Sequence, residues 1–168
     1  MDTQSAGQTA QVSPDSPQIR VLSQYLKELS FRNQLAGVSA DAYDTPPQLD
    51  MGVEVKSRPV GANNEAWEAD LCINLAARRG ETAMFSANVV YSGLFQFVNL
   101  QPEAIEPTLW IECPRLLFPF ARQHLAEVTR EGGYPPVMIN PIDFTPLYYE
   151  ELRHRREQGE RPLEASGF

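Results

Sequence analysis

The chain has 168 residues, of which 42% are hydrophobic and 21% are charged, and its formal net charge is −8. This length suits one folded domain with a real core and is short of two ordinary domains. The acidic balance argues against a nucleic-acid partner, because proteins that bind nucleic acid carry a basic surface. It fits a basic protein partner or simple solubility.

The two ends of the chain are polar and contain many small residues and prolines. Residues 1–17 and 157–168 are therefore predicted to be disordered tails on either side of one domain at 18–156. The first residues lack the basic and apolar regions of a secretory signal, and no apolar run is long enough to cross a bilayer. The two cysteines, Cys72 and Cys113, make no disulfide framework. They are expected to be buried free thiols, which predicts a cytoplasmic protein.

The first half of the folded part is predicted to form four strands. Residues 19–31 favour a strand because they lack a good helix cap, and a long irregular connection follows at 33–47. Residues 49–55 and 67–75 alternate between apolar and polar side chains, as half-buried strands do, with a polar turn at 58–65 between them. Residues 77–81 predict a hairpin turn, and residues 82–97 are its second strand. Four acids have the polar parity, which predicts an acidic outer face; they are Asp50, Glu54, Glu68 and Asp70.

The second half is predicted to be helical. Residues 102–128 contain prolines at 107, 114 and 119, each of which removes a backbone hydrogen bond and is expected to interrupt the helix. Residues 111–122 are so apolar that we expect them to be buried partly against the chain's own sheet and partly against another copy. Gly132 and Gly133 end this helix, and Thr145 with Pro146 predicts the start of a last helix at 146–158. Four strands followed by two helices define an α+β fold.

The sequence offers no convincing catalytic or metal site. His124 and His154 lack metal-ligand spacing, and no glycine-rich phosphate loop is present. Cys113 and His124 would lie roughly 16 Å apart along a helix axis, which is too far for a nucleophile and its base. A small hydrolase that uses Cys113 or His124 is therefore a poorly supported alternative. No catalytic residue, cofactor or metal is predicted.

Several aromatic residues fall in irregular or weakly held segments; they are Tyr43, Tyr134, Phe144, Tyr148 and Tyr149. Ordinary core packing is the simpler interpretation of this set. Their grouping beside a loosely held last helix also fits a groove for extended apolar segments, because aromatic rings offer large contact areas to varied partners.

The stretch Cys113-Pro-Arg-Leu-Leu-Phe-Pro-Phe-Ala-Arg122, followed by Gly132-Gly-Tyr-Pro-Pro136 and Pro141-Ile-Asp-Phe144, resembles the bacterial SecB export chaperones. Residues 25–31 and 90–95 match as well, and the likeness covers about residues 19–151. The resemblance implies a four-stranded antiparallel sheet with two helices packed on one face, assembling as a dimer of dimers through the first long helix. It implies a holdase that works without ATP, keeps unfolded secretory preproteins competent for translocation and delivers them to the SecA translocation ATPase.

The resemblance also assigns sites. The client-binding groove is expected to comprise Tyr43, Pro46, Phe144, Leu147, Tyr148 and Leu152. The SecA-binding acidic face is expected to combine Glu28, which matches a family acid, with Asp50, Glu54, Glu68 and Asp70 from the strand pattern. The interface between dimers is expected to include Leu116, Leu117, Phe120 and Leu125.

Three positions depart from the family pattern. Arg32 stands where an acid is usual, and Ser86 and Asn88 stand where an apolar residue and an acid are usual. These departures predict a weaker or shifted patch. They keep open the alternative of a SecB-like chaperone for a non-secretory client such as an antitoxin. Neither reading involves nucleic acid or direct membrane insertion.

Overall fold

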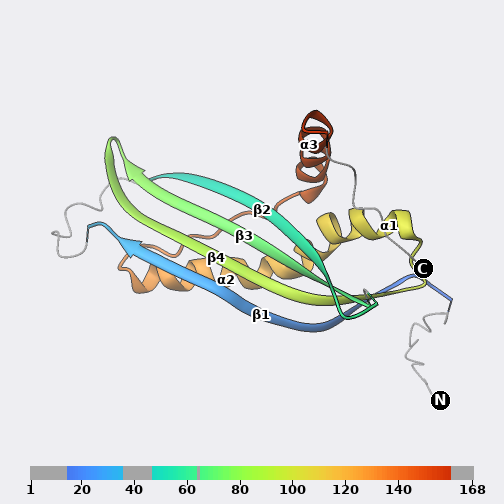
Figure 1. Ribbon diagram of the computed structural model, residues 1–168. Helices are drawn as coiled ribbons and strands as arrows, with labels where there is room; N and C mark the ends of the chain where they lie inside the picture. Colours follow the sequence, from blue (N-terminus) through green and yellow to red (C-terminus); the bar gives the residue numbers. More distant parts are fainter. Residues whose placement is uncertain (1–14, 36–46, 64, 160–168) are drawn as a thin grey trace, which may run out of the picture.

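In the computed structural model, residues 15–35, 47–63 and 65–159 are described, and they form an α+β fold. Four strands come first: β1 (Gln18–Asn33), β2 (Gln48–Val60), β3 (Ala66–Arg79) and β4 (Thr82–Val98). They make one antiparallel sheet in the order β1-β4-β3-β2, so β1 and β2 are its edge strands. The helices α1 (Pro102–Pro107), α2 (Cys113–Glu131) and α3 (Phe144–Glu157) follow (Figure 1). The predicted four-stranded antiparallel sheet and fold class are confirmed.

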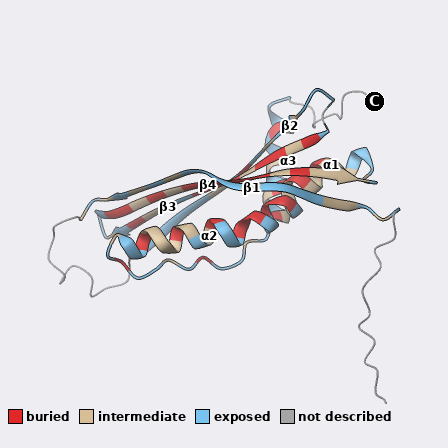
Figure 2. Cartoon of the chain, turned by 90° about the horizontal axis from the view of Figure 1, so that it is seen from below, coloured by how far each residue is buried: buried red, intermediate tan, exposed pale blue. Residues whose placement is uncertain are grey.

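The core lies between one face of the sheet and α2, which runs along that face (Figure 2). Alternate residues of β3 and β4 point into this core, as the period of two requires. Leu71 opposes Tyr91, and Ile73 opposes Val89. On α2 the fully buried residues recur at helical spacing and include Leu117, Ala121 and Leu125.

At Gly93 on β4, α2 comes too close to the sheet for any larger side chain. A Cβ atom there would lie 2.7 Å from the Phe95 ring and 3.0 Å from Cδ2 of Leu117. The absence of a side chain at Gly93 therefore allows α2 to pack closely against β4.

The helical region differs from the predicted one in its interruptions. Between α1 and α2, the turn η2 (Thr108–Glu112) is π-helical, and the Cys113 amide donates to the Thr108 carbonyl five residues earlier. This wider turn lets the chain continue as a helix from Pro107 to Pro114 without a break. The expectation that Pro119 interrupts the helix is wrong, because α2 continues through it to Glu131.

Several predicted boundaries also need correction. The predicted turn at 58–65 begins too early, because β2 continues to Val60. The last helix starts at Phe144, and its cap is Asp143, whose carboxylate accepts a hydrogen bond of 3.0 Å from the Thr145 amide. The predicted tails at 1–17 and 157–168 lie largely outside the described residues.

Candidate functional site

A hollow of about 340 Å³ separates the edge strand β2 from α3. We call it the β2–α3 hollow; it is lined by Val53, Glu54, Val55, Trp110, Leu147, Glu150, Glu151 and His154. Val53, Glu54 and Val55 are consecutive, although strand side chains alternate between faces. The hollow therefore reaches the outer edge of β2, where no strand among the described residues pairs with the backbone groups.

The predicted groove residues fall into three groups. Leu147 lines the β2–α3 hollow, and Leu152 is half-buried on the same helix. Phe144 and Tyr148 are buried, because Phe144 packs edge-on against Phe118 and Tyr148 lies beside Trp110. Tyr43 and Pro46 lie outside the described residues.

Sequence reasoning missed Trp110, which lines the hollow and contacts Tyr148 and Arg155 of α3. It lies in η2, and its aromatic ring in an apolar helical run was the available signal. The Arg155 guanidinium stacks over the ring at 4.9 Å. The hollow therefore has an apolar lining from Val53, Val55, Trp110 and Leu147, and acidic groups from Glu54, Glu150 and Glu151.

Arg155 fastens α3 to α1. Its Nη1 donates to Oε1 of Glu106 at 2.6 Å, and its Nε donates to Oε1 of Glu151 at 3.0 Å. The side chains of Arg155 and Glu106 are each only 11% exposed. This buried ion pair positions the helix that forms one wall of the hollow.

The sheet face opposite α2, which we call the open face, is ordered by the strand register. All five predicted acids lie on this face. They fall within three stretches of strand, namely residues 20–32 of β1, 50–58 of β2 and 68–76 of β3. The same stretches carry five cations on that face: Arg20, Lys27, Arg32, Lys56 and Arg58.

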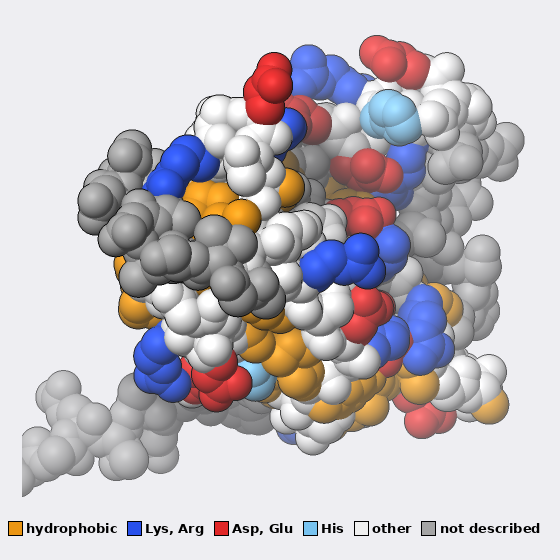
Figure 3. Space-filling view, turned by 90° about the vertical axis from the view of Figure 1, so that its left-hand side faces the viewer, with side chains coloured by type: hydrophobic (Ala, Val, Ile, Leu, Met, Phe, Trp, Pro, Cys, Tyr) orange, Lys and Arg blue, Asp and Glu red, His pale blue; other side chains and the backbone are white. Residues whose placement is uncertain are grey.

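The prediction of an acidic outer face is therefore wrong for these three stretches of strand, because their five acids are balanced by five cations. Figure 3 shows the same interleaving of acidic and basic side chains at the end of the molecule that it views. Lys56 and Arg58 share the strand parity of Asp50 and Glu54, so the sequence already contained two of the missed cations.

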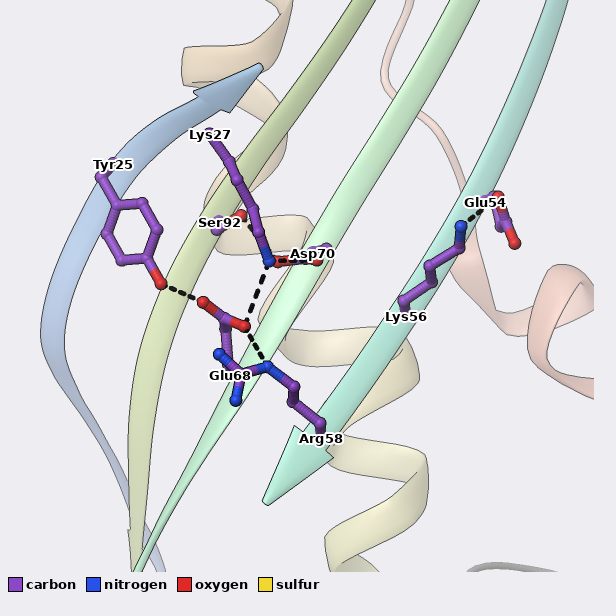
Figure 4. A network of polar contacts seen from close by, with 8 residues as sticks. All are labelled: Tyr25, Lys27, Glu54, Lys56, Arg58, Glu68, Asp70 and Ser92. Atoms are coloured by element: carbon purple, nitrogen blue, oxygen red, sulfur yellow. Dashed lines mark hydrogen bonds and ion pairs between the residues drawn. The ribbon is translucent and has the colours of Figure 1, made fainter. Parts of the chain in front are cut away.

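Glu68 is the centre of a polar cluster on the open face (Figure 4). Its carboxylate accepts hydrogen bonds from the Tyr25 hydroxyl, from Lys27 at 3.2 Å and from Arg58 at 2.6 Å. Lys27 also reaches Asp70 at 2.8 Å. A bulge between Leu26 and Glu28 makes Lys27 an extra residue in β1, which allows it to reach over the face.

The cluster also sets the protonation of Glu68. Burial alone would raise the pKa of Glu68, but the hydrogen bonds from Tyr25, Arg58 and Lys27 outweigh burial and lower it. Glu68 is therefore ionised, and both Glu68 and Asp70 form ion pairs with cations of the same chain, so they offer little free charge to a partner.

The predicted interface residues on α2 divide between two sides of the helix. Leu117 and Leu125 are fully buried in the chain's own core. Leu116 and Phe120 are 42% and 43% exposed, and Phe120 stacks on Tyr91 with ring centres 5.4 Å apart. β1 adds further exposed hydrophobic side chains; they are Val21, Leu22, Tyr25 and Leu26.

Both cysteines are free and buried, as predicted. Burial raises the pKa of Cys113 to about 12 and also raises the pKa of Cys72. His124 contacts the Tyr91 ring and lies 4.0 Å from Glu127. Neither thiol is activated as a nucleophile by these surroundings.

The described residues contain no helix with the length and apolar character that a membrane crossing requires. Within the same ranges, no group of three His, Cys, Asp or Glu side chains is arranged to hold a metal ion.

Comparison with known proteins places this α+β chain among the protein-export chaperones. The family described as SecB, preprotein translocase subunit SecB, matches residues 12–155. The chain belongs to the SecB family.

Two of its relatives are the protein-export proteins SecB of Hyphomonas neptunium and Maricaulis maris. The first is 41% identical over 161 residues, covering 95% of each chain. The second is 44% identical over 140 residues, covering 83% of this chain and 80% of the relative.

A solved structure shares the fold. It is the SecB-like chaperone Rv1957 of Mycobacterium tuberculosis in complex with a ChAD peptide from the HigA1 antitoxin. The TM-score is 0.61 at 15% identity, covering 74% of this chain and 91% of the other. At this identity the likeness concerns the fold alone.

Proposed function

We propose that this protein is a cytoplasmic holdase that binds unfolded secretory preproteins without ATP and keeps them competent for translocation. The observation that carries the proposal is the β2–α3 hollow, which joins the outer edge of β2, unpaired by any described strand, to an apolar wall. Family membership supports the export role. The proposal needs no cofactor and no catalytic residue.

The geometry suits an extended polypeptide. A client segment beside β2 pairs its backbone with the free strand edge, and this pairing does not depend on sequence. Every second client side chain then reaches toward Trp110 and Leu147. Apolar burial contributes about 25 cal/mol per Å², so one segment binds weakly and several segments on one chain bind together.

The acidic residues that line the hollow affect which client segments bind best. Glu54 and Glu150 lie beside the apolar residues, and Glu151 is held by Arg155. Segments that combine apolar with basic residues therefore fit better than acidic segments do.

Aggregation of a chemically unfolded preprotein, followed by light scattering without nucleotide, tests the proposal. The wild-type protein should suppress scattering, and Leu147→Asp should weaken suppression severalfold because it places a charge in the hollow. Tyr149→Asp is the matched control, since Tyr149 is 60% exposed on the same helix and does not line the hollow. Equal suppression by both variants, or a requirement for ATP, would reject this site or this mechanism.

Delivery to SecA is the second part of the proposal, with the open face as the receiving surface. Among its acids, Glu28 and Asp50 are exposed and have no cationic partner among the described residues. Glu54 pairs with Lys56 at 3.3 Å, and Glu68 and Asp70 belong to the polar cluster. Binding of purified SecA at low salt, weakened by Glu28→Gln, tests this step; no binding at low salt would remove it.

We further propose a homotetramer, a dimer of dimers, in which copies cover the exposed side chains of α2 and β1. Leu116 and Phe120 are one helical turn apart and share the outer side of α2. Phe120→Asp should therefore reduce the native mass, while Tyr149→Asp should leave it unchanged. A tetramer that persists in Phe120→Asp and in Leu116→Asp would contradict this interface.

A second candidate function is holding a non-secretory client such as an antitoxin. It is favoured by Arg32, which places a cation on the open face. If SecA does not bind while the protein still suppresses aggregation, this second function replaces the secretory one.

A further inference from the structure

The open face contains a second, larger hollow, of about 740 Å³, that crosses all four strands. We call it the cross-strand trough. The register aligns Arg32, Ser86, Ala76 and Asp50 in one row from β1 to β2. The next row is Ser30, Asn88, Asn74 and Gly52. The floor is low because the first row has small side chains in its middle, Ser86 and Ala76, and the second row has two asparagines there.

The two ends of the first row carry opposite charges. Arg32 and Asp50 are exposed, and neither forms an ion pair with any described residue. Three strand spacings separate them, which is about 14 Å. The floor between them is neutral, with the amide of Asn74 exposed and the amide of Asn88 donating to Glu28 at 2.8 Å. The trough therefore has a positive end at β1 and a negative end at β2.

We propose that the cross-strand trough receives an extended segment of a partner protein that carries an acidic and a basic residue four positions apart. In an extended chain, residues i and i+4 point to the same side and lie about 14 Å apart. The acidic residue pairs with Arg32 and the basic residue with Asp50. A uniformly basic segment meets Arg32 as a like charge, so the trough selects against it.

This inference rests on the proposed role of the open face as a partner surface and is independent of client holding. It adds the charge pattern of the partner and identifies Arg32 and Asp50 as the residues that determine specificity.

Two labelled synthetic peptides with a Ser/Thr/Gly background provide the probe. One carries Glu and Lys at i and i+4, and the other carries Lys at both positions. Fluorescence anisotropy at low salt measures their binding to the full-length wild type, Arg32→Glu, Asp50→Lys and the double variant. The control double variant Arg130→Glu with Glu131→Lys exchanges two exposed charges at the end of α2 and keeps the net charge.

Reversing one exposed charge replaces an attraction by a repulsion, which changes affinity about threefold to tenfold. Arg32→Glu should weaken the mixed peptide and strengthen the dibasic one by this factor. The double variant should bind the mixed peptide like the wild type, because the peptide can lie in the opposite direction. The control variant should match the wild type with both peptides.

Three results would overturn the inference. The wild type could bind the dibasic peptide at least as tightly as the mixed one, or the double variant could fail to restore mixed-peptide binding. A change of native mass in the double variant would mean that another copy of the chain covers the trough. Aggregation suppression is measured in parallel. If the wild type does not suppress aggregation, the holdase function is rejected, whereas the peptide-binding results still decide the inference about the trough.

Discussion

Removing Arg155 should release α3 from the rest of the protein. Arg155→Met leaves the Glu106 carboxylate buried without its cation, since both side chains are only 11% exposed. Loss of one partner from a buried pair costs about 3–5 kcal/mol when the surroundings stay closed. The variant also loses the hydrogen bond to Glu151 and the stacking on Trp110.

The free energy with which α3 docks sets an upper limit to this cost, because the helix can undock and expose Glu106 to water. Apart from Arg155, α3 buries two aromatic side chains, Phe144 and Tyr148, which contribute about 1.5–3 kcal/mol each. The ion pair and the aromatic contacts are therefore of similar size. A loss of about 3 kcal/mol lowers the ratio of docked to undocked helix about 150-fold.

Hydrogen exchange read by mass spectrometry measures this opening. Arg155→Met should speed amide exchange in residues 144–157 by about a hundredfold, while β3 and β4 keep their protection. Glu106→Gln combined with Arg155→Met should recover part of the loss, because no charge is then left buried. The control is Arg153→Met, which removes an exposed cation without an ion pair to any described residue. Exchange in α3 within threefold of the wild type would refute the anchoring role of Arg155.

Three further predictions concern the core, the polar cluster and the thiols. Gly93→Ala should destabilise the protein by about 1–3 kcal/mol in chemical denaturation, because the new methyl group meets Phe95 and Leu117. The pKa of Glu68 is lower in the folded protein than its usual value of 4.5, so the ionised carboxylate stabilises the fold above pH 4.5. This stabilisation is lost progressively as the pH falls from 4.5 through the lower pKa of the folded state. Glu68→Gln should therefore show a shallower loss of stability below pH 4.5, and an unchanged slope would argue against the cluster. Cys72 and Cys113 should react with a thiol reagent at pH 8 far more slowly than in the unfolded chain; equal rates would contradict their burial.

Much of the sheet could be predicted because its information is local. The alternation at 49–55 and 67–75 correctly assigns side chains to the two faces, and Gly80, with φ of 57°, lies in the predicted hairpin turn. The predicted groove was only partly placed: Leu147 lines the hollow, whereas Phe144 and Tyr148 serve the core. Amphipathic periodicity alone does not say whether an aromatic ring faces a groove or the core beneath it.

The amino-acid sequence by itself determined the α+β class, the SecB family and the parity of the strands at 49–55 and 67–75, because alternation and short motifs depend on near neighbours in the chain. The tertiary structure decided which strands are edges, since β1 pairs with β4 and leaves β2 open beside α3. It also decided the charge of the open face, because a bulge brings Lys27 over Glu68 and the register aligns Arg32 with Asp50. These features depend on contacts between residues far apart in the chain, which no local pattern specifies.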